Sequence, residues 1–454
     1  ADGNFIDIID LNDSIFYITS ETKSSDGDIS DNPWPGHSNI WTLQINKEGD
    51  ILWEGVHGGS LIDWTRDMEV TDDGGLIVLS LSNSPDGDVS NPNGSWDLWL
   101  IKLNSDGETE WDFSLGGEGG ESGGSIIETQ DGGYIVIGST EGIGGGNFDT
   151  TCNYHGTPGG GYVDVWVVKL DSLRNIEWQQ CYGGHYLDEG SNILETDDGY
   201  ICLSTTMSND GDVSGFHGVP GNMDYGHDIW VFKVDKQGNL LWQNCLGGLY
   251  LEWARDIFPT TDGGYMIVGT TASDDGDVEG YHGIDTGIYD DVWFAKIDSL
   301  GQLTWQYCYG GTGLESLYRG VYQKGDYNYV ICLGTDTDAW QCAGQMWPDL
   351  RIVELYDSTV GIIENNPESS GENLSVEVFP NPTNERITFA YTLPSGNTSG
   401  KLSVFSSSGK LVRGFDLMAK RGQVVYNTSG LNPGVYFYTL RALKQKTTGK
   451  FVIL

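Results

Sequence analysis

The chain of 454 residues has no run of 18 or more consecutive apolar residues, and so no segment typical of a membrane-spanning helix. Basic residues are also scarce, at 23 Lys and Arg against 66 Asp and Glu. The scarcity is confined to residues 1–373, because residues 374–454 hold ten basic and only three acidic side chains. Such an acidic field argues against nucleic acid as a partner of the larger part, and it attracts hard divalent cations.

Several signatures of chemistry are also missing. There is no Gly-x-Ser-x-Gly elbow, no His-Glu-x-x-His pair and no phosphate-binding glycine loop before a helix, so no catalytic constellation stands out. No leader peptide precedes Ala1, which reads as the start of a mature or trimmed chain. Export must therefore be inferred from the other end of the chain.

The seven cysteines contain no Cys-x-x-Cys pair, which argues against a structural zinc site. Cys181, Cys245 and Cys308 fall at the same point of successive repeats, and we predict that they are small buried hydrophobic residues. A local disulfide between Cys332 and Cys342 is the alternative use of cysteine that the spacing allows.

What the chain does have is an internal repeat of about 60 residues built around paired tryptophans. The members of each pair lie twelve residues apart, at Trp41/Trp53, Trp99/Trp111, Trp166/Trp178, Trp230/Trp242 and Trp293/Trp305. A Gly-Gly pair follows each second Trp, and an acidic residue lies four positions beyond that pair, at Asp63, Glu121, Asp188, Glu252 and Glu315. A strand, a tight Asp-Gly turn and another strand follow, so each repeat predicts four strands, A to D.

The C strands are apolar on both faces: Trp166, Val168 and Leu170 lie on one face, Val165 and Val167 on the other. Antiparallel sheets buried on both sides must stack face to face, and radial stacking leaves only short edges. We predict an all-β fold: a six-bladed β-propeller with four-stranded antiparallel blades over residues 1–364, a linker over 365–373 and a small Ig-like β-sandwich over 374–454. Seven blades and an open stack are the alternatives. The sixth repeat lacks the Trp pair, and its D strand is doubtful.

The repeated run Trp-x-x-x-x-Gly-Gly-x-x-x-(Asp/Glu), with Asp-Gly-Gly-Tyr-Ile-Val-x-Gly and Asp-x-Trp-x-x-Lys, resembles the SBBP-type β-propeller repeat over most of residues 4–356. The resemblance implies a propeller. It implies almost nothing about a ligand, because one fold serves many functions.

Alternating strand directions place the tight A–B and C–D turns on one face of the propeller, and the long, acidic B–C loops with the D–A crossings on the other. Long loops on a rigid scaffold are where binding usually resides, so we predict the ligand on this loop face. The five repeated acids either bond backbone N–H groups at the start of each A strand or open onto this face near the channel mouth. His155, His217 and His282 precede glycines in similar loops, where packing or a loop hydrogen bond competes with a transition-metal site.

Four loops share an Asp-Gly-Asp motif, whose two carboxylates can converge on one hard cation. This predicts calcium, with Asp26 and Asp28, Asp86 and Asp88, Asp210 and Asp212, and Asp275 and Asp277 as the first ligands. The competing interpretation is a repeated Asx turn that holds the shape of the loop without metal.

The tail alternates apolar and polar residues in short strands, which predicts a sandwich of about seven strands. Its motifs resemble the C-terminal sorting domain of type IX secretion cargo in the Bacteroidota; the matching residues are Phe379, Pro380, Asn381 and Pro382, then Gly409, Lys410 and Leu411, then Gly434 and Tyr436, and finally Lys450. The resemblance implies the type IX translocon and its sortase machinery as partners. It also implies a secreted or cell-surface location, associated with the outer membrane.

Three functions are therefore open. The first is a non-enzymatic binding protein whose acidic loop face engages a glycan or a protein. The second is a glycan-active hydrolase or lyase at the channel mouth, drawing on the long loop from Glu141 to Val163. The third is a structural component of a cell-envelope assembly or filament.

Overall fold

A computed structural model describes residues 5–12, 14–222, 226–260, 262–283, 290–311, 315–325, 328–335 and 349–356, and in the tail 374–379, 383, 386–394, 399–406, 410–428, 430–431, 433–442 and 445–453. The chain divides into two compact units, of which the first holds residues 1–323 and 330–352 and the second the rest. All described elements are strands, and no described segment forms a helix that could cross a membrane.

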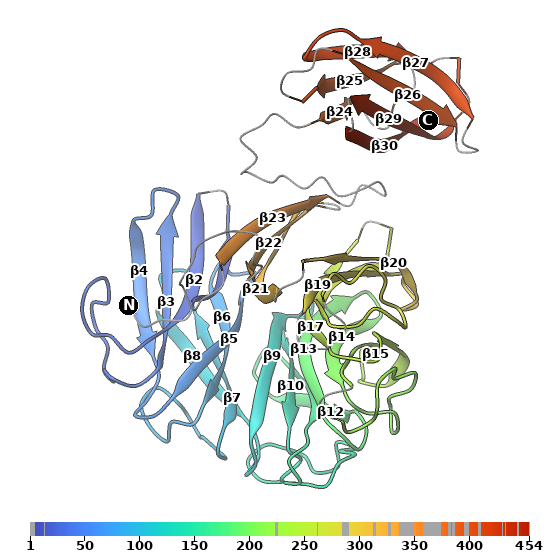
Figure 1. Ribbon diagram of the computed structural model, residues 1–454. Coiled ribbons are helices and arrows are strands. Elements are labelled where there is room, and N and C mark those ends of the chain that lie inside the picture. Colours follow the sequence, from blue (N-terminus) through green and yellow to red (C-terminus); the bar gives the residue numbers. More distant parts are fainter. Residues whose placement is uncertain are drawn as a thin grey trace. The chain divides into compact units, whose positions relative to one another are not determined.

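Five four-stranded antiparallel sheets follow one another along the chain, each in simple sequence order (Figure 1). Their strands are β1 (Phe5–Asp10), β2 (Ile15–Thr22), β3 (Asn39–Asn46), β4 (Ile51–His57); β5 (Asp63–Val70), β6 (Leu76–Ser82), β7 (Asp97–Leu103), β8 (Thr109–Leu115); β9 (Glu121–Glu128), β10 (Tyr134–Thr140), β11 (Asp164–Leu170), β12 (Ile176–Tyr182); β13 (Asp188–Thr196), β14 (Gly199–Thr206), β15 (Asp228–Asp235), β16 (Leu240–Leu246); and β17 (Glu252–Pro259), β18 (Tyr265–Thr271), β19 (Asp291–Ile297), β20 (Leu303–Tyr309). We call these sheets blades 1 to 5.

A sixth sheet contains β21 (Glu315–Gly325), β22 (Asn328–Thr335) and β23 (Asp349–Tyr356). It shows three strands within the described residues, at the place where the sequence made the fourth strand doubtful. The predicted linker over 365–373 lies outside the described residues.

The blades stack face to face, as two-sided burial requires. The innermost strands β1, β5, β9, β13 and β17 are neighbours in that order. In β11, Trp166, Val168 and Leu170 belong to a core shared with blade 2, whereas Val165 and Val167 belong to a core shared with blade 4. The assignment of these side chains to two faces is thus confirmed, and with it the propeller type of fold.

The two tryptophans of each repeat have different roles. Trp99, Trp166, Trp230 and Trp293 are fully buried in the C strands, and each indole N–H donates to a polar side chain thirteen residues later. The second tryptophans of blades 1 to 4, in the D strands, pack against the C–D turn of the next blade. Trp178 donates from Nε1 to the carbonyl of Lys236 at 3.0 Å. The C-strand tryptophans therefore fill the cores between the sheets, and the D-strand tryptophans connect neighbouring blades.

The second unit contains a seven-stranded sandwich, as predicted from the alternation. One sheet has the order β24 (Ser375–Phe379), β25 (Arg386–Thr392), β28 (Arg421–Asn427), and the other β27 (Leu411–Leu417), β26 (Gly400–Ser406), β29 (Gly434–Ala442), β30 (Gln445–Ile453). Its core includes Phe389, Leu440 and Phe451. The sequence pattern had not indicated β27 as a strand.

Candidate functional site

The repeated acids are structural in this fold. Their side chains are at most 4% exposed, and each carboxylate accepts the N–H of the second glycine of the preceding pair. Asp188, for example, accepts from Gly184 N at 2.7 Å and from the hydroxyls of Thr206 and Ser208. Bonding at the start of each A strand is therefore what Asp63, Glu121, Asp188, Glu252 and Glu315 do. The expectation that they open onto the loop face is wrong, because the crossing and the strand ends enclose them.

Burial also sets the protonation of these acids. Desolvation raises the pKa of Glu121 and of Asp188 to about 7 and that of Glu252 to about 8, against the lowering effect of their hydrogen bonds.

The Asp-Gly-Asp loops close over the crossing that leads into their own blade. Asp86 accepts from Ser60 N at 2.9 Å, and Asp88 accepts from Gly58 N at 3.1 Å. The same bonds recur with Asp210 and Asp212 in blade 4 and with Asp275 and Asp277 in blade 5. For Asp26 and Asp28 in blade 1, the segment preceding β1 lies outside the described residues. The motif is thus a clamp that gives backbone N–H groups their acceptors.

The rest of the motif serves the same clamp. The apolar residue after the second Asp is buried at Ile29, Val89, Val213 and Val278. In blade 2 the following Ser90 donates to Asp112, which also accepts from the indole of Trp99. In blade 2 the Asp, Val and Ser side chains of the motif are therefore all hydrogen-bonded or buried, and a Cβ on Gly87 would lie 2.3 Å from Gly58 O.

Within the described residues, no group of three or more His, Cys, Asp or Glu side chains is arranged to hold a metal ion. Calcium at the Asp-Gly-Asp pairs stays a prediction of the sequence. Because the carboxylates already accept N–H groups, we expect the clamp to persist without an ion. The melting temperature of the full chain should then be the same in calcium and in excess EDTA, and a fall in EDTA would restore calcium as a ligand of these loops.

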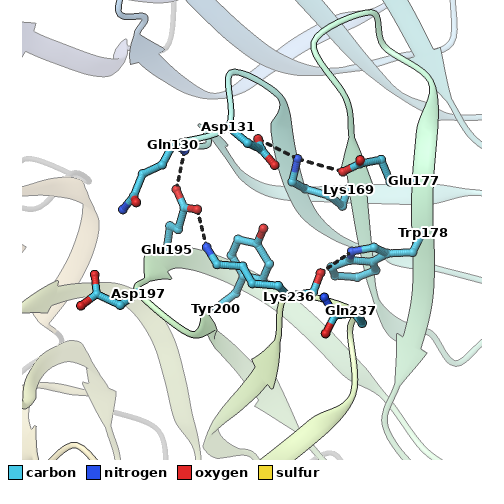
Figure 2. A pocket seen from close by; sticks show the side chains of 10 residues that line it. All are labelled: Gln130, Asp131, Lys169, Glu177, Trp178, Glu195, Asp197, Tyr200, Lys236 and Gln237. Carbon is cyan, nitrogen blue, oxygen red and sulfur yellow. Dashed lines mark hydrogen bonds and ion pairs between the residues drawn. The ribbon is translucent and has the colours of Figure 1, made fainter.

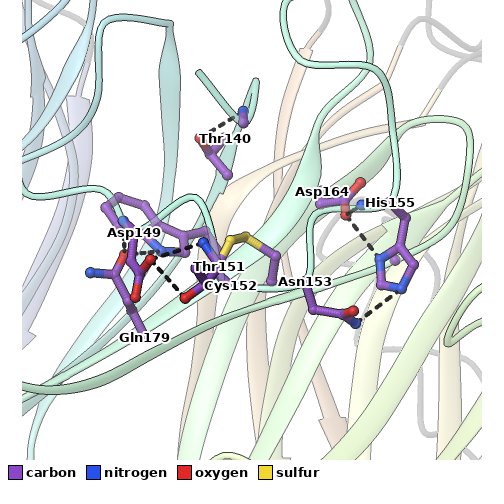
Figure 3. Close-up of a disulfide and its surroundings, with 12 residues drawn as sticks. Thr140, Asp149, Thr151, Cys152, Asn153, His155, Asp164 and Gln179 are labelled. Carbon is purple, nitrogen blue, oxygen red and sulfur yellow. Dashed lines mark hydrogen bonds and ion pairs between the residues drawn. A yellow bond between two sulfur atoms is a disulfide. The ribbon is translucent and has the colours of Figure 1, made fainter. Parts of the chain in front are cut away.

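Blade 3 builds the clamp from other residues. Asn147 takes the place of the second Asp and accepts from Gly116 N at 2.9 Å, and Phe148 takes the place of the buried valine. Beyond it, Cys152 forms a disulfide with Cys181 at the end of β12 (Figure 3). The prediction that Cys181 is an unpaired hydrophobic residue is wrong, whereas Cys245 and Cys308 are free and buried. The pairing that we considered for Cys332 involves Cys342, which lies outside the described residues.

The three loop histidines do not converge on one point. Each bonds an aspartate at the start of the C strand of its own blade: His155 with Asp164, His217 with Asp228 and His282 with Asp291. His155 Nε2 also lies 3.5 Å from Asp212 of the next blade, and His217 Nε2 lies 3.7 Å from Asp277. The hydrogen bond to the aspartate, aided by the neighbouring carboxylates, raises the pKa of His155 and of His217. In blades 3 and 4 the histidine thus holds an aspartate of its own blade by a hydrogen bond and places its other ring nitrogen beside a carboxylate of the next blade.

An open cavity of about 570 Å³ lies on the opposite face, between the short turns of blades 3 and 4 (Figure 2). We call it the 3/4 groove; its lining residues are Gln130, Asp131, Lys169, Glu177, Trp178, Glu195, Asp197, Tyr200, Lys236 and Gln237. The sequence pattern did not indicate a site on this face, because its turns are short and uniform.

One wall of the 3/4 groove repeats from blade to blade. The buried Lys169 donates to Asp131 at 3.1 Å and lies 3.2 Å from Glu177, as Lys102 does with Asp73 and Glu110 in blade 2. On the other wall, Glu195 and Tyr200 have counterparts in blade 3, Glu128 and Tyr134, but blade 3 has Ser172 at the position of Lys236. Lys236 pairs with Glu195, and its ammonium group lies 4.6 Å from the centre of the Tyr200 ring.

The signal for this wall was present in the sequence. At the position of Lys236 in the C–D turn, blades 2, 3 and 5 have Ser105, Ser172 and Ser299, and blade 1 has Lys47. Lysine at this position, which also occurs as Lys47, says little until the fold places Glu195 of β13 and Tyr200 of β14, both from the same blade, beside Lys236.

Residues 377–454 match the family described as the secretion system C-terminal sorting domain. This tail marks the chain for type IX export, to the cell surface or outside the cell. No curated protein matched the chain.

Solved structures are similar at low identity. A glycoside hydrolase family 43 arabinoxylan arabinofuranohydrolase from Bacillus subtilis, in complex with cellotetraose, is 11% identical, covers 98% of this chain and 93% of its own, and has a TM-score of 0.31. A family 43 β-1,3-galactosidase is 11% identical over 94% and 90%, with a TM-score of 0.35. Prolyl oligopeptidase B from Galerina marginata is 9% identical over 86% and 46%, with a TM-score of 0.41. At these scores the likeness carries no argument about what this chain does.

Proposed function

We propose that this exported propeller is a non-enzymatic binding protein and that the 3/4 groove holds a neutral carbohydrate chain. The observation that supports the proposal is the lining of the groove, where carboxylates, ammonium groups and the exposed amides of Gln130 and Gln237 alternate. A sugar hydroxyl both donates and accepts hydrogen bonds, so a wall with both kinds of group suits it.

Charge selects among carbohydrates. The groove has four carboxylates and two lysines, and residues 1–373 as a whole hold 63 acidic and 13 basic side chains. Anionic polysaccharides and nucleic acids would be repelled, whereas an uncharged chain is not. The loop face, where we first predicted the ligand, supports binding less well because many of its carboxylates already accept backbone N–H groups.

One carboxylate of the groove, Asp131, is unsuited to acid catalysis. Desolvation alone would raise the pKa of Asp131, but hydrogen bonds from Thr129, Gly133 and Lys169 lower this pKa to about 2. A glycosidase needs one carboxyl group that keeps its proton near neutral pH, and Asp131 cannot serve as that general acid.

The test is binding of neutral oligosaccharides to the purified full chain, first on an array and then by titration calorimetry. Lys236→Ala leaves Glu195 without its ion-pair partner and removes a charged donor from the wall, which should weaken affinity by roughly tenfold or more. Lys47→Ala is the matched control, since Lys47 holds the same turn position in blade 1. An array blank for every neutral glycan, or equal effects of the two variants, would refute the carbohydrate proposal and direct the search to protein partners.

A further inference from the structure

A second buried carboxylate faces each of the repeated acids Glu121, Asp188, Glu252 and Glu315. Between blades 2 and 3 it is Asp97, the first residue of β7, which is 1% exposed. A Cβ placed on Gly116 would lie 2.1 Å from Asp97 Oδ1 and 2.5 Å from Glu121 Oε2. Both oxygens therefore face the same small space beside this glycine.

The hydrogen bonds around this pair leave one oxygen without a donor. Glu121 accepts from Gly117 N at 3.2 Å and from the Thr140 hydroxyl at 3.0 Å, and Asp97 Oδ2 accepts from Asn93 N at 2.6 Å. Asp97 Oδ1 is buried and has no partner among the described residues. A buried carboxylate oxygen without a donor is costly, and two adjacent buried carboxylates do not both ionise readily.

Among the described residues, no positively charged side chain acts on Asp97 or Glu121. Besides each other, the charged group that acts on Glu121 is Glu141, which begins the B–C loop of blade 3. The other groups that bond the pair are neutral: the backbone at Asn93, Gly94 and Gly117, and the hydroxyl of Thr140 in β10. Desolvation raises the pKa of Asp97 as well as that of Glu121.

The junction between blades 1 and 2 shows what charge this space accepts. There Asn39 stands at the position of Asp97, and a Cβ on Gly58 would lie 2.3 Å from Asn39 Oδ1 and 2.6 Å from Asp63 Oδ2. Because Asn39 is neutral, Asn39 and Asp63 together carry one negative charge at most. If Asp97 and Glu121 held one proton between them, that pair would also carry one negative charge.

We propose that Asp97 and Glu121 share one proton, taken up from solvent and held on Glu121 as an O–H that donates to Asp97 Oδ1, so that the junction between blades 2 and 3 loosens when the proton is lost. The same arrangement recurs as Asp164 with Asp188, Asp228 with Glu252 and Asp291 with Glu315, each with a histidine added.

The direction of the pH effect follows from the retained proton. Where the folded state holds a proton that the unfolded state has released, stability falls as pH rises. For Glu121 this range runs from the ordinary value of 4.5 to about 7. Above this pH range both Asp97 and Glu121 are negatively charged.

The test is thermal melting of the full chain between about pH 5 and about pH 8.5. We expect the wild-type melting temperature to fall over this range, that of Asp97→Asn to fall less, and that of Asn39→Asp, which creates the pair between blades 1 and 2, to fall more. Asp197→Asn, which removes an exposed carboxylate, should match the wild type.

Infrared spectroscopy gives a second measurement that does not depend on melting. The band of protonated carboxyl groups near neutral pH should weaken in Glu121→Gln. A wild-type melting temperature that is constant over the range, or Asp97→Asn and Asn39→Asp slopes equal to the wild type, would overturn the proposal. If Asp97→Asn does not fold, the Asn39→Asp slope and the infrared band decide.

Discussion

Deletion of residues 374–454 is expected to keep the protein from reaching the cell exterior while its propeller still folds. The tail matches the sorting domain, and the two units have separate hydrophobic cores. Deletion of the tail should therefore remove the sorting signal and leave the contacts that stabilise the blades intact. The measurement is fractionation of a host with type IX secretion: the truncated chain should accumulate in the periplasm, and little of it should appear at the surface or in the medium.

Two point variants test whether export requires the tail to be folded or only to be present. Tyr436 is 8% exposed and stacks on Phe451 with ring centres 5.6 Å apart, so Tyr436→Ala should unfold the sandwich and reduce export. Val425 is 54% exposed on the neighbouring sheet, and Val425→Ala should leave export unchanged. Normal surface display of the truncated chain would contradict the assignment of the tail.

The sequence predicted the fold well because the residues that are buried between blades recur at regular intervals along the chain. The Trp pairs, the Gly-Gly pairs and the two-faced C strands each recur at fixed positions, and every one of them reports packing between neighbouring sheets. The tail was predicted for the same reason, although β27, with Gly414 and Asp416 among its residues, lacks the alternation that reveals a strand.

The sites were harder to predict because spacing does not identify a partner. Two aspartates around a glycine look alike whether they hold a cation or cap backbone N–H groups, and only the crossing beside Asp86 and Asp88 shows the second. Cys181 looked like Cys245 and Cys308 because its partner, Cys152, lies 29 residues earlier in a loop that varies. The 3/4 groove combines Glu195, Tyr200 and Lys236, which come from β13, β14 and the turn after β15 and meet only when blade 4 folds.

Sorting motifs show the same limit in the tail. Tyr436 and Phe379 lie in strands, but Tyr436 is buried and Phe379 is 45% exposed. Pro380, Asn381, Pro382 and Gly409 lie outside the described residues. Lys410 lies directly before β27, and Gly434 is the first residue of β29. Lys450 lies in β30 and is paired in the sheet with Phe437 of β29. A family motif thus mixes residues that fold the domain with residues that are exposed.

Trp230→Ala is expected to lower the free energy of unfolding by about 3–5 kcal/mol, the usual cost of removing a fully buried large aromatic side chain. Trp230 has no exposed surface, and its ring centre lies 4.3 Å from that of Phe232. Its indole N–H also donates to Gln243 at 2.8 Å, so the variant leaves a cavity and a polar group without its donor. Urea denaturation of the full chain, followed by tryptophan fluorescence, measures the change.

Trp305→Ala is the matched control, because Trp305 comes from the same repeat pattern but lies in the outer strand β20 and is 39% exposed. Its removal should cost about 1–2 kcal/mol, since part of the ring is in water in the folded state as well. The difference between the two variants measures how far the C strands are enclosed by neighbouring sheets. Equal costs would mean that the inner tryptophans are not packed between blades, and the stacked arrangement on which the junction pairs and the 3/4 groove depend would then be wrong.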